Sequence, residues 1–92
     1  MKKITFSADT RRYTVASFAV AKDNETPIEA VKRSIERTSG YRVHYARHMH
    51  WTQNHDGSHA SDTFQVTLTE RTQNRQGGGW GVTGEFGVTI FN

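Results

Sequence analysis

The stretch 41–53, YRVHYARHMHWTQ, alternates between two kinds of side chain along its whole length. Its odd-numbered positions are mostly large and apolar, whereas its even-numbered positions are basic or polar and include no acid. Such alternation, in a segment rich in aromatic and β-branched residues, is typical of a β-strand with one buried face. We therefore predict a long strand here. The residues predicted to point into the core are Val43, Tyr45, Met49 and Trp51.

The other face of this strand is expected to remain in solvent. It carries a ladder of guanidinium and imidazole groups, formed by Arg42, His44, His48 and His50. Guanidinium stays charged at neutral pH and can bind a phosphate or carboxylate through two hydrogen bonds. Imidazole, with an unperturbed pKa of about 6.5, is largely neutral there. We expect arginines rather than histidines to supply the main contacts of a binding surface.

A single helix is predicted immediately before this strand, over 27–38. Thr26 is a good N-cap, Pro27 suits the first helical position, and Glu29 completes a capping box. Gly40 tolerates the left-handed conformation that ends many helices. One apolar stripe repeats with helical spacing. Its members are Ile28, Val31 and Ile35.

Four other segments, at 2–8, 11–22, 63–72 and 82–91, alternate as strands. Segment 11–22 is apolar at both parities, and we place Phe18 and Val20 inward because they are the larger residues. In the other three segments one parity is clearly apolar. The inward residues predicted there are Ile4, Phe6, Phe64, Val66, Leu68, Phe86, Val88 and Ile90.

The fold class expected from these segments is α+β, a single domain over 1–92 with element order ββαβββ. We predict an antiparallel sheet with the one helix packed on one face. If the core sets of 41–53 and 63–72 share a face, the numbers of paired residues must sum to an odd value. A sum near 115 places His50 opposite Gln65, His48 opposite Thr67 and His44 opposite Arg71. For the last two strands, a sum near 154 pairs Leu68 with Phe86.

The composition sets limits on location and chemistry. Twelve Lys and Arg against nine Asp and Glu give a formal charge of +3, which suits nucleic acid or an acidic protein surface without deciding between them. The absence of cysteine excludes disulfides and thiolate metal sites. No secretory signal or bilayer-spanning segment is recognisable in the sequence. We expect a cytoplasmic protein without membrane contact.

Further residues in predicted turns and loops are candidates to extend the basic face. Arginine and aromatic side chains together suit phosphates and stacked bases, and they also suit protein interfaces. Arg47 is expected at the rim of the apolar face. Arg71, on the solvent face of segment 63–72, is expected to join the ladder. The candidates in turns and loops are Arg11, Arg12, Arg75 and Trp80.

Metal binding and catalysis receive less support. His48 and His50 have a spacing that can chelate zinc or copper, but their expected neighbours supply no carboxylate. Ser58 and Ser61 lie near His59 in sequence without forming a recognisable triad, and the glycines at 77–79 lack the GK[ST] of a phosphate-binding loop. We expect a non-enzymatic protein with no cofactor and no small-molecule substrate.

The stretches ITFSADTRRYTVASFAVAKDNE, ETPIEAVKRSIERTSG and GGGWGVTGEFGVTIF give the chain a resemblance, in size and order of elements, to a known class. It resembles the small phage-encoded anti-CRISPR proteins that act on type I-F surveillance complexes. The resemblance implies a non-enzymatic phage or mobile-element inhibitor that binds the CRISPR RNA–protein complex and blocks target DNA. Because no motif is shared, no functional residue is transferred. The alternatives are a small basic RNA- or DNA-binding module and a histidine-based metal-binding protein.

Overall fold

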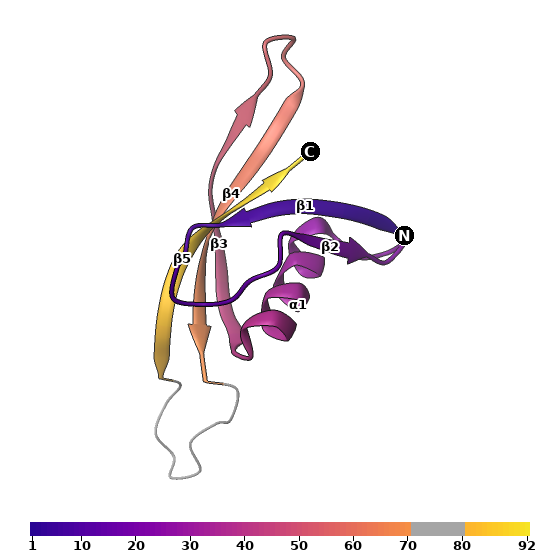
Figure 1. The fold of residues 1–92 in the computed structure, drawn as a ribbon. Coiled ribbons are helices and arrows are strands. Elements are labelled where there is room, and N and C mark those ends of the chain that lie inside the picture. Colours follow the sequence, from indigo (N-terminus) through magenta and orange to yellow (C-terminus); the bar gives the residue numbers. More distant parts are fainter. Residues whose placement is uncertain (71–80) are drawn as a thin grey trace.

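A computed structural model of the chain describes residues 1–70 and 81–92, which form one helix and five strands (Figure 1). The strands make one antiparallel sheet in the order β2-β1-β5-β4-β3. The predicted α+β class is therefore confirmed. In chain order the elements are β1 (Lys2–Ala8), β2 (Phe18–Ala21), α1 (Pro27–Ser39), β3 (Arg42–Gln53), β4 (His59–Thr69) and β5 (Val82–Phe91).

The helix forms where its end signals predict it. The Thr26 hydroxyl accepts a hydrogen bond from the Glu29 backbone N–H (3.4 Å), and the Glu29 carboxylate accepts one from the Thr26 backbone N–H (3.2 Å). At the other end Gly40 is left-handed, with φ 79°, and its N–H donates to the Glu36 carbonyl. These local contacts satisfy backbone groups that a helix end leaves unpaired.

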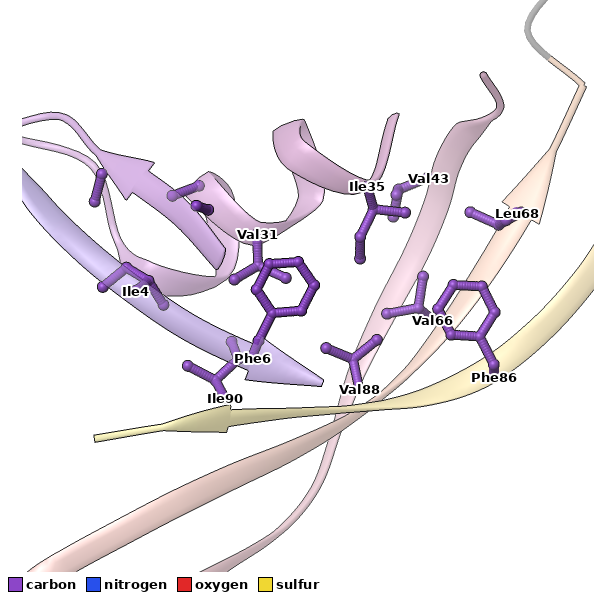
Figure 2. Packing of buried hydrophobic residues seen from close by; sticks show 13 residues of the cluster. Ile4, Phe6, Val31, Ile35, Val43, Val66, Leu68, Phe86, Val88 and Ile90 are labelled. Atoms are coloured by element: carbon purple, nitrogen blue, oxygen red, sulfur yellow. The ribbon is translucent and has the colours of Figure 1, made fainter. Parts of the chain in front are cut away.

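The core lies between α1 and one face of the sheet, which we call the helix face (Figure 2). Val31 and Ile35 are fully buried, whereas Ile28 is only partly buried. Most sheet residues predicted to point inward are buried as well, and Phe64 is half-buried. The confirmed set is Ile4, Phe6, Val66, Leu68, Phe86, Val88 and Ile90.

The inward side of β2 was predicted wrongly. Ala19 and Ala21 are buried, while Phe18 and Val20 are 46% and 42% exposed. The reason is the close approach of α1, whose Ser34 hydroxyl donates to the Phe18 carbonyl. Only small side chains fit between a strand and a helix held this near. Side-chain size, taken alone, gave the opposite answer.

The predicted register between β3 and β4 is also wrong, because bulges interrupt it. Val43 lies opposite Leu68, but the next partners are Tyr45 and Thr67, so His44 is an extra residue. A second shift between His48 and His50 makes Met49 extra. Paired numbers sum to 111 at Val43 (43 + 68) and to 113 at His50 (50 + 63), not to 115. Each bulge exchanges the faces to which odd and even residues point.

The predicted burial of β3 is also wrong. Only Val43 is buried in this strand, and Tyr45, Met49 and Trp51 are 55%, 47% and 51% exposed. The first bulge turns Tyr45 to the face away from α1, whereas Trp51 lies on the helix face, opposite Asp62, and is exposed there. The proposed single-face ladder is wrong too, because His48 pairs with Phe64 while His50 pairs with Thr63, and these two β4 residues belong to opposite faces.

Between β4 and β5 the predicted parity is confirmed, but the predicted register is off by two residues. Val66 lies opposite Phe86 (66 + 86 = 152), and Leu68 lies opposite Gly84. The glycine leaves room on the helix face for the ring of Tyr13, which packs against Phe86 with centroids 5.9 Å apart. The Tyr13 hydroxyl donates to the Thr83 carbonyl at 3.1 Å.

Candidate binding surface on the β3–β4 hairpin

The hairpin of β3 and β4 projects beyond the rest of the sheet (Figure 1). The neighbouring strand β5 pairs with β4, and this ladder ends where Ser61 lies opposite Phe91. Beyond this point the hairpin continues as a two-stranded ribbon. A tight turn closes it: the Asn54 N–H donates to the Ser58 carbonyl (2.8 Å), and Gly57 has φ 86°.

The closing turn is ordered by Asp56. Its carboxylate accepts hydrogen bonds from the hydroxyl (2.6 Å) and backbone N–H (2.9 Å) of Ser58. These bonds favour the ionised carboxylate and lower the pKa of Asp56. The turn is therefore a defined structure and holds the ends of both strands together.

Three half-exposed apolar side chains and one arginine follow one another along β3. We call Tyr45, Arg47, Met49 and Trp51 the hairpin surface; all four are exposed. Tyr45 and Arg47 pair with Thr67 and Gln65 on the open face of the sheet, away from α1, whereas Trp51 pairs with Asp62 on the helix face. The surface therefore wraps around the strand at the edge of the sheet.

A carboxylate shared by two histidines joins the two strands beneath Trp51. Asp62 accepts a hydrogen bond from His48 Nε2 at 2.8 Å through one oxygen and from His59 Nε2 at 2.7 Å through the other. The hydrogen bond from His48, followed by that from His59, lowers the pKa of Asp62. A bulge at Ala60 places His59 and Asp62, three residues apart, on the same face.

This histidine pair also orients the exposed indole. The rings of Trp51 and His59 stack nearly parallel, with centroids 5.4 Å apart and an interplanar angle of 4°. His48 meets the Phe64 ring edge-on at 5.1 Å. Trp51 is thus held in place although half of its surface is exposed. An aromatic side chain that is already ordered loses little conformational entropy when it binds.

The chemistry of this cluster is that of a structural network. Both Nε2 atoms are engaged by the Asp62 carboxylate, and within residues 1–70 and 81–92 no group of three or more histidine and acidic side chains is placed to hold a metal ion. The nearby hydroxyls are engaged elsewhere. Ser58 donates to Asp56, and Ser61 pairs with Thr52 at 2.6 Å.

A hollow of about 360 Å³ lies on the inner side of the hairpin base. Residues of β1, the start of α1, β4 and the end of β5 line it. Its apolar lining includes Ile28, Phe64 and Ile90, with Lys2 and Asp62 among its polar residues. Its size and mixed lining are adequate for a side chain of a docked partner.

The sites predicted from sequence are only partly brought together. Arg47, His48 and His50 lie on the outer half of β3, whereas Arg42 and His44 are exposed near its start. The Arg12 guanidinium lies 5.3 Å from the Tyr13 ring, and Tyr13 contacts Tyr41, so the loop of Arg11 and Arg12 approaches the start of β3. Three predicted residues lie outside the described part of the chain: Arg71, Arg75 and Trp80.

The expectation that no carboxylate lies beside His48 was wrong, because Asp62 belongs to β4 and bonds its ring. Sequence reasoning also missed the exposed positions of Tyr45, Met49 and Trp51. The spacing of His59 and Asp62 was visible, but their common face depends on the bulge at Ala60. No local sequence signal indicated the bulges, because they arise from the pairing of two strands.

Comparisons with known proteins identify no relative of this chain, so a functional proposal must rest on the hairpin surface. No helix in the described part of the chain is both long and apolar enough to cross a membrane. The chain matches no protein-family model, and searches of curated proteins and of solved structures find no match to it.

Proposed function

We propose that the protein is a non-enzymatic binding protein that docks its β3–β4 hairpin onto a protein component of a nucleic-acid-processing assembly. The observation that carries the proposal is the hairpin surface: Tyr45, Met49 and Trp51, each about half exposed, lie with Arg47 along one edge strand. Tyr, Trp, Met and Arg are the residues enriched in protein interfaces and their hot spots. Exposed apolar side chains gathered in this way mark an interaction site.

The charge of the hairpin favours a protein partner over naked nucleic acid. In residues 45–62, Arg47 is the one permanently charged cation, while Asp56 and Asp62 are acids, so the formal charge is −1 with neutral histidines (1 − 2). Non-specific binding of RNA or DNA depends on several cations that neutralise phosphates. The hairpin lacks such a cluster. We therefore keep a free-standing nucleic-acid-binding module as the second candidate.

The resemblance to anti-CRISPR proteins supplies the partner class: a CRISPR RNA–protein surveillance complex of type I-F. A small protein without catalytic groups can inhibit such an assembly by occupying a surface that target DNA needs. Docking of the hairpin on the complex is therefore the proposed step of inhibition.

The test is a competition assay with the purified surveillance complex and labelled target DNA. Trp51→Ala and Tyr45→Ala should each weaken competition about tenfold or more, because both remove hot-spot side chains. Val20→Ala is the matched control, since Val20 is similarly exposed on the opposite edge of the sheet. Circular dichroism checks the fold of each variant.

Two results would contradict the proposal. Equal competition by the wild type and both hairpin variants would show that the hairpin is not the docking surface. Steeply salt-dependent binding to naked RNA or DNA, without binding to the assembled complex, would favour the nucleic-acid module instead.

A further inference from the structure

The helix α1 covers one edge strand of the sheet, β2, but reaches only the start of the other edge strand, β3. At the β2 edge, α1 covers the strand: Arg33 Nη2 donates to the Val20 carbonyl at 2.9 Å, and Ser34 donates to the Phe18 carbonyl at 3.2 Å. At the β3 edge, α1 reaches the start of the strand, where the Val43 N–H donates to the Glu36 carboxylate at 2.9 Å. Among the described residues β3 is the last strand, and it continues past the helix (Figure 1).

An uncovered strand edge offers backbone groups for pairing. In an edge strand, alternate N–H and C=O groups point away from the sheet and can accept one more strand. The outer part of β3, residues 45–53, spans about 30 Å at roughly 3.4 Å per residue. This length is sufficient for a partner segment of ordinary strand length.

The charge of the strand restricts which segment can pair there. The outer part of the strand, residues 45–53, carries Arg47 and two histidines and no acid. A second copy of this chain, paired edge to edge, would bring these basic residues against one another, and like charges opposite each other destabilise a sheet. A segment that carries carboxylates would instead be attracted to it.

The two faces of β3 define the pattern of that segment. On the open face the strand presents Tyr45, Arg47 and His50, so acidic residues are favoured on that side. On the helix face it presents Ala46, His48 and Trp51. His48 is already bonded to Asp62 and packs against Phe64, so apolar residues are favoured on the other side. A strand pairs with its neighbour so that opposite residues share a face. The complementary sequence therefore alternates acidic and apolar residues.

We infer that the free edge of β3 takes up an extended segment of the partner protein, with alternating acidic and apolar residues, as a sixth strand of the sheet. The inference rests on the proposed function and states how the hairpin would dock. The bulges at His44 and Met49 leave two short stretches of regular edge, Tyr45 to His48 and His50 to Thr52. Bulges also limit pairing with unsuitable strands.

The test uses the full chain and capped eight-residue peptides, one alternating Glu and Val and the other alternating Lys and Val. The acidic peptide should protect alternate amides of residues 45–52 from hydrogen exchange, and the basic peptide should not. Arg47→Glu should weaken binding of the acidic peptide at least tenfold and allow the basic peptide to bind. Lys22→Glu is the matched control, because Lys22 is exposed just after β2, at the opposite edge of the sheet; its affinity should equal that of the wild type.

Two N-methylated forms of the acidic peptide distinguish binding through backbone hydrogen bonds from binding through side-chain attraction alone. Because only every second peptide amide faces β3, methylation of one alternate set should abolish binding, and methylation of the other set should leave it. Equal binding by both forms would overturn the inference. The inference would also be wrong if millimolar acidic peptide left the amides of residues 45–52 unprotected. It would be wrong as well if oligo-deoxythymidine, or self-association of the protein without peptide, protected the same amides.

Failure of this inference can be told apart from failure of the proposed function. If Trp51→Ala prevents competition by the protein, but the surveillance complex leaves the amides of residues 45–52 unprotected, docking holds and strand addition is wrong. If the hairpin variants compete as well as the wild type, the proposed function itself is wrong, whatever the peptides do.

Discussion

Asp62 links the two strands of the projecting hairpin at the level of single residues. Its two oxygens accept hydrogen bonds from His48 on one strand and His59 on the other, and His59 in turn stacks against Trp51. The Asp62 carboxylate therefore holds the two strands together and, through His59, orients the exposed Trp51 ring. The sequence contains all four residues but gives no indication that they meet.

The pH dependence of this contact has a definite sign. The folded-state pKa of Asp62 lies below its ordinary value of 3.8, so the unfolded carboxylate binds protons more readily than the folded one. The stabilisation is complete well above pH 3.8 and is lost as the pH falls through the folded-state pKa. Asp62→Asn should therefore cost about 1 kcal/mol of unfolding free energy at neutral pH, reduced by solvent exposure.

Urea unfolding of wild type and Asp62→Asn, measured between pH 7 and pH 2.5, checks this expectation. The difference between the two proteins should shrink below pH 3.8. Asp56→Asn is a useful control, since its carboxylate bonds only within the turn. A difference between wild type and Asp62→Asn that grows on acidification would refute the assigned role.

Two glycines of β5 offer a second test at residue scale. A methyl group at Gly84 would collide with the Tyr13 hydroxyl, whereas one at Gly87 would meet no atom within 4 Å. Gly84→Ala should cost about 1–3 kcal/mol through overpacking, while Gly87→Ala should be neutral or slightly stabilising. Thermal unfolding of both variants measures the contrast, and equal melting temperatures would show that Tyr13 does not pack over Gly84.

At the scale of elements, the helix was predictable and the longest strand was not. The signals for α1 are local: the cap, the proline, the apolar stripe and the final glycine all lie within fifteen residues of one another. The bulges of β3 depend on how it pairs with β4, and the burial of Ala19 depends on how near the helix lies. Periodicity therefore predicted that β3 is a strand but assigned the residues between the two bulges, Tyr45 to His48, to the wrong face.

Two substitutions in and beside α1 should lower the free energy of unfolding by measurable amounts. Thr26→Ala should cost about 1 kcal/mol, because it removes the acceptor for the Glu29 N–H. Ile35→Ala should cost about 2–5 kcal/mol, because Ile35 is fully buried in the core shown in Figure 2. Chemical denaturation checks both values. Unchanged stability of Ile35→Ala would be incompatible with the observed packing of the helix.

At the scale of the whole molecule, the protein joins a packed core to a projecting ribbon. The core residues lie on α1, β1, β2, β5 and the inner halves of β3 and β4, while every residue from Arg47 to His59 is exposed. Segments with few buried contacts open with a lower free energy than the core. Amides in residues 52–60 should therefore exchange faster than amides of Val66, Leu68 and Val88. Hydrogen exchange followed by NMR measures this gradient, and uniform protection would contradict it.

The position of β5 has a consequence for how the protein is made. This strand is the last of the five along the chain, yet it occupies the centre of the sheet, between β1 and β4. During synthesis the β3–β4 hairpin can form as soon as it leaves the ribosome, because its strands are neighbours in sequence. The earlier β1–β2 unit has no partner strand until residues 82–91 emerge. A ribosome that stalls before residue 82 would leave β1 and β4 without the strand that pairs with both, so the sheet is joined only when residues 82–91 emerge.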